Sequence, residues 1–270
     1  MARLAHATLD ADPPLTAQEH GALPRDVDRD VLHIASYNIH RCVGTDLRRD
    51  VERVANVICE LGCDTIGLQE VDSRPGERSD SMQLDYLAKA TGMEAVAGTT
   101  LIRHDREYGN ALLTRRRILD VKRHDLSYGK YEPRGALEVD LEVQGHVMRV
   151  FVMHLGLLPS ERRFQMRKVL ETLRKVPHDQ PVVVLGDINE WLPLSRPLRW
   201  LHNLLGKPPW QRTFPVWAPL FALDRVWVRP VGSLLDFRVH RSPASRRASD
   251  HFPVTARVLP AAVPLREREP

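Results

Sequence analysis

Polar residues of catalytic type stand where the apolar segments of this sequence begin or end. Any one of them alone is ordinary turn chemistry, but eight such side chains are more than turns require. They are Asn38 in "ASYNIH", Glu70 in "LQEVD", His154 in "HLG", Asp187 and Asn189 in "LGDIN", Asp224 in "LDRVWV", and Asp250 and His251 in "SDHFPV". We therefore expect these residues to meet at one site.

The residue types in this set suit a metal ion and a proton-transfer pair. Asn38, Glu70 and Asp250 offer hard oxygen ligands, which Mg²⁺ and Mn²⁺ prefer. A histidine beside a carboxylate partner, such as His251, can act as a general base or acid near neutral pH. Both features point to a hydrolytic reaction that uses a divalent cation.

Two further segments favour a phosphoester as the group attacked. In "GDIN", the alternation of a strand lets Asp187 and Asn189 point to the same side. Arg134 can hold a nonbridging phosphate oxygen through two parallel hydrogen bonds. With a divalent ion, these groups fit attack of water on a phosphoester. The chain has no HExxH, GxxxxGK[ST] or GxSxG motif, so zinc proteolysis, P-loop nucleotide binding and serine esterase chemistry fit poorly.

Strand patterns outnumber helix patterns in the segments that must hold these side chains. Helices are predicted over residues 50–62, 81–93 and 160–176, with Ser81 and Ser160 as N-caps of the last two. The strict alternation of 137–143 predicts a half-exposed strand, and Gln144-Gly145 joins it to 146–155 as a hairpin. The other predicted strands cover 31–40, 63–72, 108–115, 181–189, 223–228 and 251–259. This mixture predicts an α+β, layered α/β fold.

Composition and cysteine content indicate one ordinary globular domain. Hydrophobic residues make up 43% and charged residues 27% of the 270 residues, and no apolar run reaches the roughly 20 residues that span a bilayer. The sequence indicates a polar, disordered leader (1–28), a catalytic domain (29–260) and a flexible tail (261–270). The leader lacks a signal-peptide pattern, and Cys42, Cys59 and Cys63 are expected to be buried free thiols. These features predict a cytoplasmic monomer without a transmembrane segment.

Positive charge is concentrated in one late segment. Residues 191–249 hold ten Lys and Arg against two acids, although the whole chain has a net charge of only +4. All five tryptophans lie in the same segment. A positive field of this kind attracts anions, so this segment is expected to face the substrate.

Taken in order, the motifs resemble those of the endonuclease/exonuclease/phosphatase family. The likeness runs over residues 31–259 and is carried by "LQEVD", "HLG", "LGDIN", "LDRVWV" and "SDHFPV" in series. The resemblance implies a four-layer αββα sandwich, with two mixed β-sheets packed face to face and helices outside. It also implies an active site at one edge, with one or two Mg²⁺ or Mn²⁺ ions.

The resemblance implies a metal group and a base. Glu70 resembles the principal metal carboxylate of the family, helped by Asn38 and Asp250. His251 resembles the base that activates water, oriented by Asp224. A neutral His251 suits this role, and Asp224 is expected to raise its pKa modestly. The last predicted strand would begin at the active-site edge with Asp250 and His251.

Other matched residues are implied to contact the phosphate. Asp187 and Asn189 resemble the pair that positions the nucleophile and the phosphate, or that holds a second ion. His154 resembles a donor that stabilises the transition state. Arg134 of "PRGAL" resembles a phosphate-binding arginine of deoxyribonuclease-like members.

The substrate is left open between two classes. Asn110, Tyr108, Arg246, Arg247 and Trp217 are the candidates for substrate contact. A Trp- and Pro-rich loop (206–221) before Asp224 favours a lipid or small-molecule phosphodiester, with peripheral contact at the inner face of a membrane. The same basic, Trp-containing segment suits an endonuclease or exonuclease on DNA or RNA. A non-catalytic phosphate-binding module fits least, because no matched catalytic position is substituted.

Overall fold

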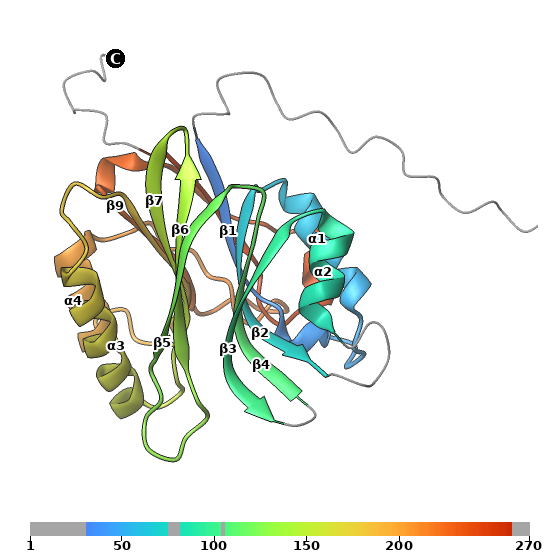
Figure 1. Cartoon of the computed structure of the whole chain (residues 1–270). Helices are drawn as coiled ribbons and strands as arrows, with labels where there is room; N and C mark the ends of the chain where they lie inside the picture. Colours follow the sequence, from blue (N-terminus) through green and yellow to red (C-terminus); the bar gives the residue numbers. More distant parts are fainter. Residues whose placement is uncertain (1–30, 75–81, 104–105, 261–270) are drawn as a thin grey trace, which may run out of the picture.

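Two mixed β-sheets pack face to face, with helices on their outer sides (Figure 1). The computed structural model describes residues 31–74, 82–103 and 106–260, so the predicted leader (1–28) and tail (261–270) lie outside the described residues. The four-layer αββα sandwich implied by the sequence motifs is confirmed.

The first sheet holds six strands in the order β10-β11-β1-β2-β4-β3. Its strands are β1 (Leu32–Asn38), β2 (Thr65–Ser73), β3 (Glu94–Arg103), β4 (Arg106–Thr114), β10 (Leu234–Val239) and β11 (Val254–Val258). Helices α1 (Val51–Leu61) and α2 (Gln83–Thr91) pack on its outer face through one apolar cluster. The short helix α5 (Pro243–Ala248) joins β10 to β11.

The second sheet holds five strands in the order β5-β6-β7-β8-β9. Its strands are β5 (Ile118–Asp125), β6 (Gly135–Val143), β7 (His146–His154), β8 (Val182–Asp187) and β9 (Asp224–Arg229). Helices α3 (Pro159–Arg174) and α4 (Arg196–Leu205) cover its outer face. Two 3₁₀ turns, His40–Cys42 and Val231–Ser233, complete the described elements.

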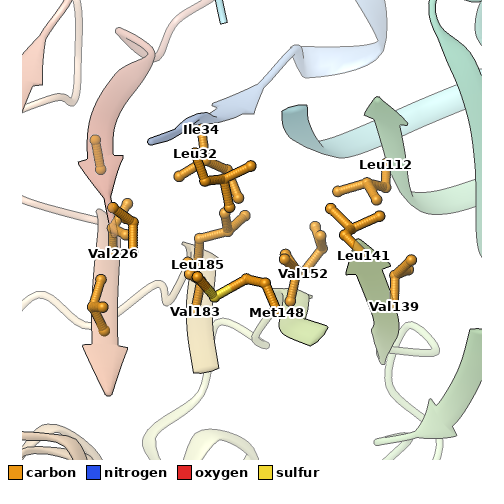
Figure 2. Close-up of a cluster of buried hydrophobic side chains, with 14 of the residues drawn as sticks. Leu32, Ile34, Leu112, Val139, Leu141, Met148, Val152, Val183, Leu185 and Val226 are labelled. Carbon is orange, nitrogen blue, oxygen red and sulfur yellow. The ribbon is translucent and has the colours of Figure 1, made fainter. Parts of the chain in front are cut away.

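The main core lies between the two sheets (Figure 2). Alternate residues of each strand face it, so Leu32 and Ile34 of β1 meet Val183 and Leu185 of β8, all fully buried. Each such side chain contributes roughly 1.5–3 kcal/mol when it leaves water. This apolar layer fixes how the two sheets lie against each other, and therefore how their ends meet.

Helix α1 begins where the sequence predicts a helix, whereas α3 does not begin at the predicted N-cap residue. Asp50 caps α1 by accepting a hydrogen bond from the backbone N–H of Arg53. Ser160 was expected to cap the third helix, but the N-cap is Leu158. Pro159 takes the first helical position, where its missing N–H costs nothing. The expected cap Ser81 of α2 lies outside the described residues, and the N-cap there is Met82.

Two strand predictions need correction. The acids of β6 were expected to face solvent, but Glu138 and Asp140 are 4% and 8% exposed. Arg149 binds Asp140 through two hydrogen bonds of 2.7 and 2.6 Å, which compensates for the buried charge. The last strand begins at Val254, so Asp250 and His251 lie in the loop before it. A loop can aim both side chains at one site, whereas a strand would place them on opposite faces.

The sequence did not predict strands β3, β5 and β10 or helix α5. All three missed strands are edge strands of their sheets. Among residues 31–74, 82–103 and 106–260, no helix has the length and apolarity required to cross a bilayer.

Gly186 of β8 lies where the backbone leaves no room for a side chain. Its φ of +144° is rare for residues with a side chain, and a Cβ there would lie 1.8 Å from the carbonyl oxygen of Met153. We expect Gly186→Ala to lower the free energy of unfolding by about 3 kcal/mol, measured by urea denaturation. Gly232→Ala is the control, since a Cβ at Gly232 meets no atom within 4 Å. Equal stability of the two variants would contradict this account.

Candidate active site

An open cavity of about 340 Å³ lies where one end of both sheets comes together. Eight of the residues predicted from the sequence line it: Glu70, Tyr108, Arg134, His154, Asp187, Asn189, Asp250 and His251. Asn38 and Asp224 lie just behind this lining and contact it through hydrogen bonds. The predicted catalytic and metal-binding residues are therefore together in space.

Strand register explains part of this convergence. Asp187, at the end of β8, is paired with His154 at the end of β7 on one side. On the other side it is paired with Asp224 at the start of β9. Asn38, at the end of β1 in the opposite sheet, donates a hydrogen bond of 3.0 Å to Asp187 Oδ2. Asp187 thus links the two sheets at the floor of the cavity.

His251 is held by a buried carboxylate. Its Nδ1 lies 2.8 Å from Asp224 Oδ2, and its Nε2 lies 3.7 Å from Asp187 Oδ2. The ring also packs against Phe214, with the ring centroids 4.7 Å apart. Since Asp224 occupies Nδ1, Nε2 is the nitrogen that can exchange a proton with a group in the cavity.

The pKa of His251 is raised far more than the sequence suggested. Burial lowers this pKa, but the carboxylates of Asp224, Asp187 and Asp250 outweigh it and raise the pKa to about 10. Burial raises the pKa of Asp187 to about 6, against the lowering effect of His251. The modest rise expected from Asp224 alone was wrong, because three acids surround the ring rather than one. In the metal-free protein, His251 is therefore an imidazolium at neutral pH.

This charge state predicts a titration that can be observed directly. In the metal-free protein the His251 ring should lose its proton near pH 10, followed by NMR of its ring carbon. The folded pKa exceeds the unfolded value of about 6.5. The charged ring therefore stabilises the fold fully below about pH 6.5, and this contribution is lost as the pH rises through about 10. A midpoint near 6.5 would show that the carboxylates do not act together on the ring.

Thr213 is a buried residue of this group that sequence reasoning missed. Its hydroxyl donates a hydrogen bond of 2.6 Å to Asp224 Oδ2, the same oxygen that holds His251. Thr213 lies in the Trp- and Pro-rich loop (206–221), but a threonine hydroxyl there gives no signal in the sequence that it will contact Asp224.

Removal of this hydroxyl should weaken the hold on Asp224 and His251 without unfolding the protein. We expect Thr213→Val to lower kcat by about 10- to 100-fold, as for other partners that orient a reacting group. Thr213→Ser should recover most of the rate, since the hydroxyl is kept. Steady-state kinetics with thermal unfolding as a companion measurement tests this, and a Thr213→Val enzyme with normal kcat would remove Thr213 from the mechanism.

His154 lies between two hydrogen-bond donors. Arg134 contacts its Nδ1 and the Asn189 amide nitrogen contacts its Nε2, each at 3.0 Å. Burial, Arg134 and His251 lower the pKa of His154 well below its usual value, so the ring is neutral. A neutral imidazole can accept at only one nitrogen. The three groups therefore present more donors than acceptors, and Arg134 Nε is also buried without a partner. An anionic oxygen would satisfy them.

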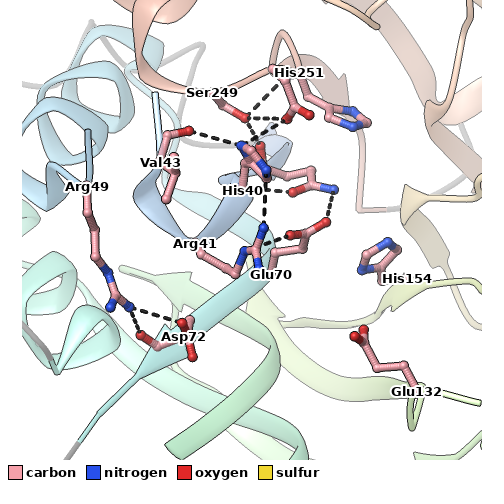
Figure 3. Close-up of polar contacts among 12 residues, drawn as sticks. His40, Arg41, Val43, Arg49, Glu70, Asp72, Glu132, His154, Ser249 and His251 are labelled. Atoms are coloured by element: carbon pink, nitrogen blue, oxygen red, sulfur yellow. Dashed lines mark hydrogen bonds and ion pairs between the residues drawn. The ribbon is translucent and has the colours of Figure 1, made fainter. Parts of the chain in front are cut away.

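Glu70 is aimed at the cavity by an irregular backbone. The register of β2 against β4 shifts between Leu68 and Val71, and Glu70 has a φ of +60°. Such strain in a residue with a side chain is typical of functional positions. Asn38 Nδ2 donates to Glu70 Oε1 at 3.2 Å and so fixes the carboxylate. Figure 3 shows Glu70 facing the space that His154 and His251 also approach.

Two groups of residues could hold a cation. Asp187, Asp224 and His251 offer atoms within 4.8 Å of one another. However, Asp224 Oδ2 already accepts from Thr213 and lies on His251 Nδ1, which makes this group a proton-transfer unit. The carboxylates of Glu70 and Asp250 form the second group, and they are hard oxygens that open on the cavity, so they fit Mg²⁺ or Mn²⁺. Asn38 adjoins Glu70, but its amide nitrogen donates to that carboxylate and its oxygen accepts from the backbone N–H of His40.

The turn after β1 brings two further residues to the cavity that were not foreseen. His40, Arg41 and Cys42 all have left-handed φ values, between 45° and 58°. The turn is held by Gln83 Nε2, which donates 2.7 Å to the Arg41 carbonyl oxygen. Figure 3 shows His40 and Arg41 near Glu70. Glu132, Arg106 and Trp191 also line the cavity without having been predicted.

Four of the candidate substrate residues do not line this cavity. Asn110 is buried and donates to the carbonyl oxygen of Gly135 at 2.8 Å, so it supports the backbone next to Arg134. Arg246 donates to the carbonyl oxygen of Val216, and Trp217 is 74% exposed beside that contact. Arg247 is exposed on α5. Of the five candidates, only Tyr108 faces the cavity directly.

Comparison with known proteins matches this description. Residues 35–251 match the model of the "Endonuclease/Exonuclease/phosphatase family". The uncharacterized protein YbhP of Escherichia coli K12 is 27% identical over 258 residues, which cover 87% of this chain and 99% of YbhP.

Two solved structures show that the shared fold accompanies different substrates. Zebrafish TDP2 in complex with a single-stranded DNA product has a TM-score of 0.63 at 19% identity, over 84% of this chain and 98% of that one. The mannosyl-6-phosphatase Bt3783 of Bacteroides thetaiotaomicron has a TM-score of 0.64 at 18% identity, over 83% and 98%. At these identities the likeness concerns the fold alone.

Proposed function

This chain belongs to the endonuclease/exonuclease/phosphatase family, whose members hydrolyse phosphoesters, and we propose that it is a divalent-metal-dependent phosphodiesterase. The favoured substrate is a lipid or small-molecule phosphodiester. The observation that carries the proposal is the joint placement of three groups in one cavity. They are the donor cluster around His154, the His251–Asp224 pair and the oxygen ligands around Glu70.

The donor cluster supports binding of the phosphoryl group. A phosphate oxygen placed between Arg134, His154 and Asn189 would accept from all three donors and relieve their mutual mismatch. These donors are fixed in the folded protein, so they need not reorganise as negative charge grows on the phosphoryl oxygens. His154 and Arg134 are 4% and 9% exposed, and this burial strengthens each interaction.

The His251–Asp224 pair supports activation of water. His251 Nε2 would take a proton from the attacking water while Asp224 holds Nδ1 in place. Asp187 would orient the water from the other side, and its Oδ1 is itself fixed by the backbone N–H of Asn189 at 2.9 Å. For this step His251 must be neutral, so its pKa must fall from about 10.

Glu70, Asn38 and Asp250 would hold the cation. When bound, a divalent cation supplies positive charge that polarises the phosphoryl oxygens and offsets the carboxylates around His251. The same proposal allows a second ion, which Asp187 and Asn189 would hold.

A lipid substrate is supported by the apolar loop beside the cavity. Trp217 and Leu220 are 74% and 57% exposed, on the loop between Thr213 and Leu223. Arg246 binds the carbonyl oxygen of Val216 in this loop, so a cation lies next to the exposed tryptophan. This combination suits the headgroup region of an anionic bilayer, and we propose peripheral contact there.

A panel of substrates tests this function. The purified protein with Mg²⁺ or Mn²⁺ is offered anionic phospholipid vesicles, bis-p-nitrophenyl phosphate and supercoiled plasmid, each with and without EDTA. The proposal is supported if the protein hydrolyses the lipid or the small diester but not the plasmid, and if EDTA abolishes that hydrolysis. Absence of metal-dependent hydrolysis of every phosphoester would refute it.

The second candidate is a nuclease. Exposed Arg241, Arg246 and Arg247 lie in the segment that leads to His251, where they could bind a phosphate backbone. TDP2, which shares the fold, has been solved with a DNA product. Nicking of the plasmid that EDTA abolishes would favour this candidate over the lipid phosphodiesterase.

A further inference from the structure

Glu132 is an acid in a cavity otherwise suited to an anion. It lies in the connection between β5 and β6, and its carboxylate Oε1 is 3.0 Å from Arg134 Nη1. Its side chain is 50% exposed, so one side of the carboxylate is open to the cavity that it lines. Figure 3 shows Glu132 directed toward the space below His154, apart from the Glu70 group.

Besides the phosphate-binding donors, the cavity is lined by two unlike groups of side chains. The first group, the apolar wall, consists of Trp191 and Phe214. Trp191 is held edge-on against Phe214 and Phe221, with centroid distances of 5.7 and 4.6 Å. This wall is rigid and suits the apolar substituent of a diester.

The second group, the polar wall, carries hydrogen-bond donors and a carboxylate acceptor. Its members are Arg106, Tyr108 and Glu132. Arg106 is fixed by Asp72, with Nε 2.5 Å from Oδ1, and its guanidinium lies over the Tyr108 ring at 5.0 Å. The wall therefore has a set geometry before any ligand arrives.

A carboxylate beside a bound phosphate repels it. The ion pair with Arg134 offsets part of this cost, and a hydrogen bond donated by the substrate to the open side of Glu132 would offset more. An ammonium group would donate such a bond, but it would also meet the guanidiniums of Arg106 and Arg134. A second phosphate would be attracted by the arginines but repelled by Glu132. A hydroxyl can donate to Glu132 and accept from Arg106, which satisfies both without a new charge.

We propose that Glu132, with Arg106 and Tyr108, selects a phosphodiester whose substituent on this wall bears hydroxyl groups, as in a polyol ester. The inference rests on the proposed phosphodiesterase function and names the chemistry of one side of its substrate. Glu132 is then a specificity-determining residue, whereas Arg134, His154 and Asn189 bind any phosphoester.

Two chromogenic diesters with the same leaving group test this selection. Methyl p-nitrophenyl phosphate has no hydroxyl, and 2,3-dihydroxypropyl p-nitrophenyl phosphate has two. We expect wild-type kcat/KM to favour the dihydroxypropyl ester by about tenfold, the worth of one hydrogen bond to a charged group. Glu132→Ala should reduce this preference to about twofold or less.

Glu132→Gln separates selection from simple support of Arg134. The amide oxygen can still accept from Arg134, but the negative charge beside the phosphate is gone. We therefore expect kcat/KM for the methyl ester to rise about threefold while the hydroxyl preference shrinks. Glu142→Gln is the matched control, because Glu142 is also half-exposed and paired with one arginine, Arg117, but does not line the cavity.

The outcomes distinguish this inference from the function on which it rests. If neither diester is hydrolysed with metal present, the phosphodiesterase function itself fails. If wild type hydrolyses both esters equally well, the function stands and the selection by Glu132 is refuted. If both Glu132 variants slow the two esters in equal proportion, Glu132 only positions Arg134, and the selection is again refuted. A higher kcat/KM for a diester whose substituent carries a phosphate than for the dihydroxypropyl ester would also refute the selection by Glu132.

Discussion

His251→Ala is expected to lower kcat by about 10²- to 10⁴-fold, because it removes both the proton acceptor and the group that Asp224 orients. His251 Nε2 is the ring nitrogen that faces the cavity, since Nδ1 lies 2.8 Å from Asp224. The rate should be measured at saturating metal with the diester that the wild-type enzyme prefers.

The loss must come from chemistry rather than from unfolding. His251 is buried against Phe214, so its truncation also removes packing, and circular dichroism must show that the variant is folded. His146→Ala is the matched control, since His146 is exposed in the β6–β7 hairpin and should leave kcat unchanged. Partial recovery of His251→Ala by added imidazole would confirm the role of the ring. Retention of more than about a tenth of the wild-type rate would contradict the role of His251 as the general base.

The sequence predicted buried strands better than edge strands. The interior strands β7 and β8 carry continuous apolar runs, over residues 150–153 and 182–185, because both of their faces are covered. The missed strands β3, β5 and β10 lie at sheet edges, and β5 exposes charged residues such as Lys122 and Arg123. Edge strands need polar residues to avoid pairing with other chains, so their pattern resembles that of a loop.

Site residues that lie in a recognisable motif could be predicted from the sequence. Site residues that only the fold brings to the cavity could not. Asp187 and His154 stand at the ends of apolar segments, and their pairing across β7 and β8 brings them together. Thr213 and Glu132 come from loops without apolar periodicity, and only tertiary packing places them beside Asp224 and Arg134. The pKa of His251 was misjudged for the same reason, since it depends on carboxylates from three separate segments.

Glu70→Gln is expected to have the other large effect, through the cation. An amide is a weaker ligand than a carboxylate for Mg²⁺ or Mn²⁺ and leaves the site with one negative charge fewer. We expect kcat/KM at about 1 mM metal to fall by at least about 10²-fold.

Much of this loss should return at high metal concentration, because Glu70→Gln weakens binding of the ion while the rest of the site is kept. Asn38 can still hold the side chain in place, since an amide oxygen also accepts its hydrogen bond. Calorimetric titration with Mn²⁺ should show weaker binding to Glu70→Gln than to Glu171→Gln, a change of an exposed acid on α3. Unchanged Mn²⁺ affinity together with lost activity would mean that Glu70 acts on the substrate directly. The cation would then have to be held elsewhere, and the Asp187–Asp224–His251 group would be the remaining place for it among the described residues.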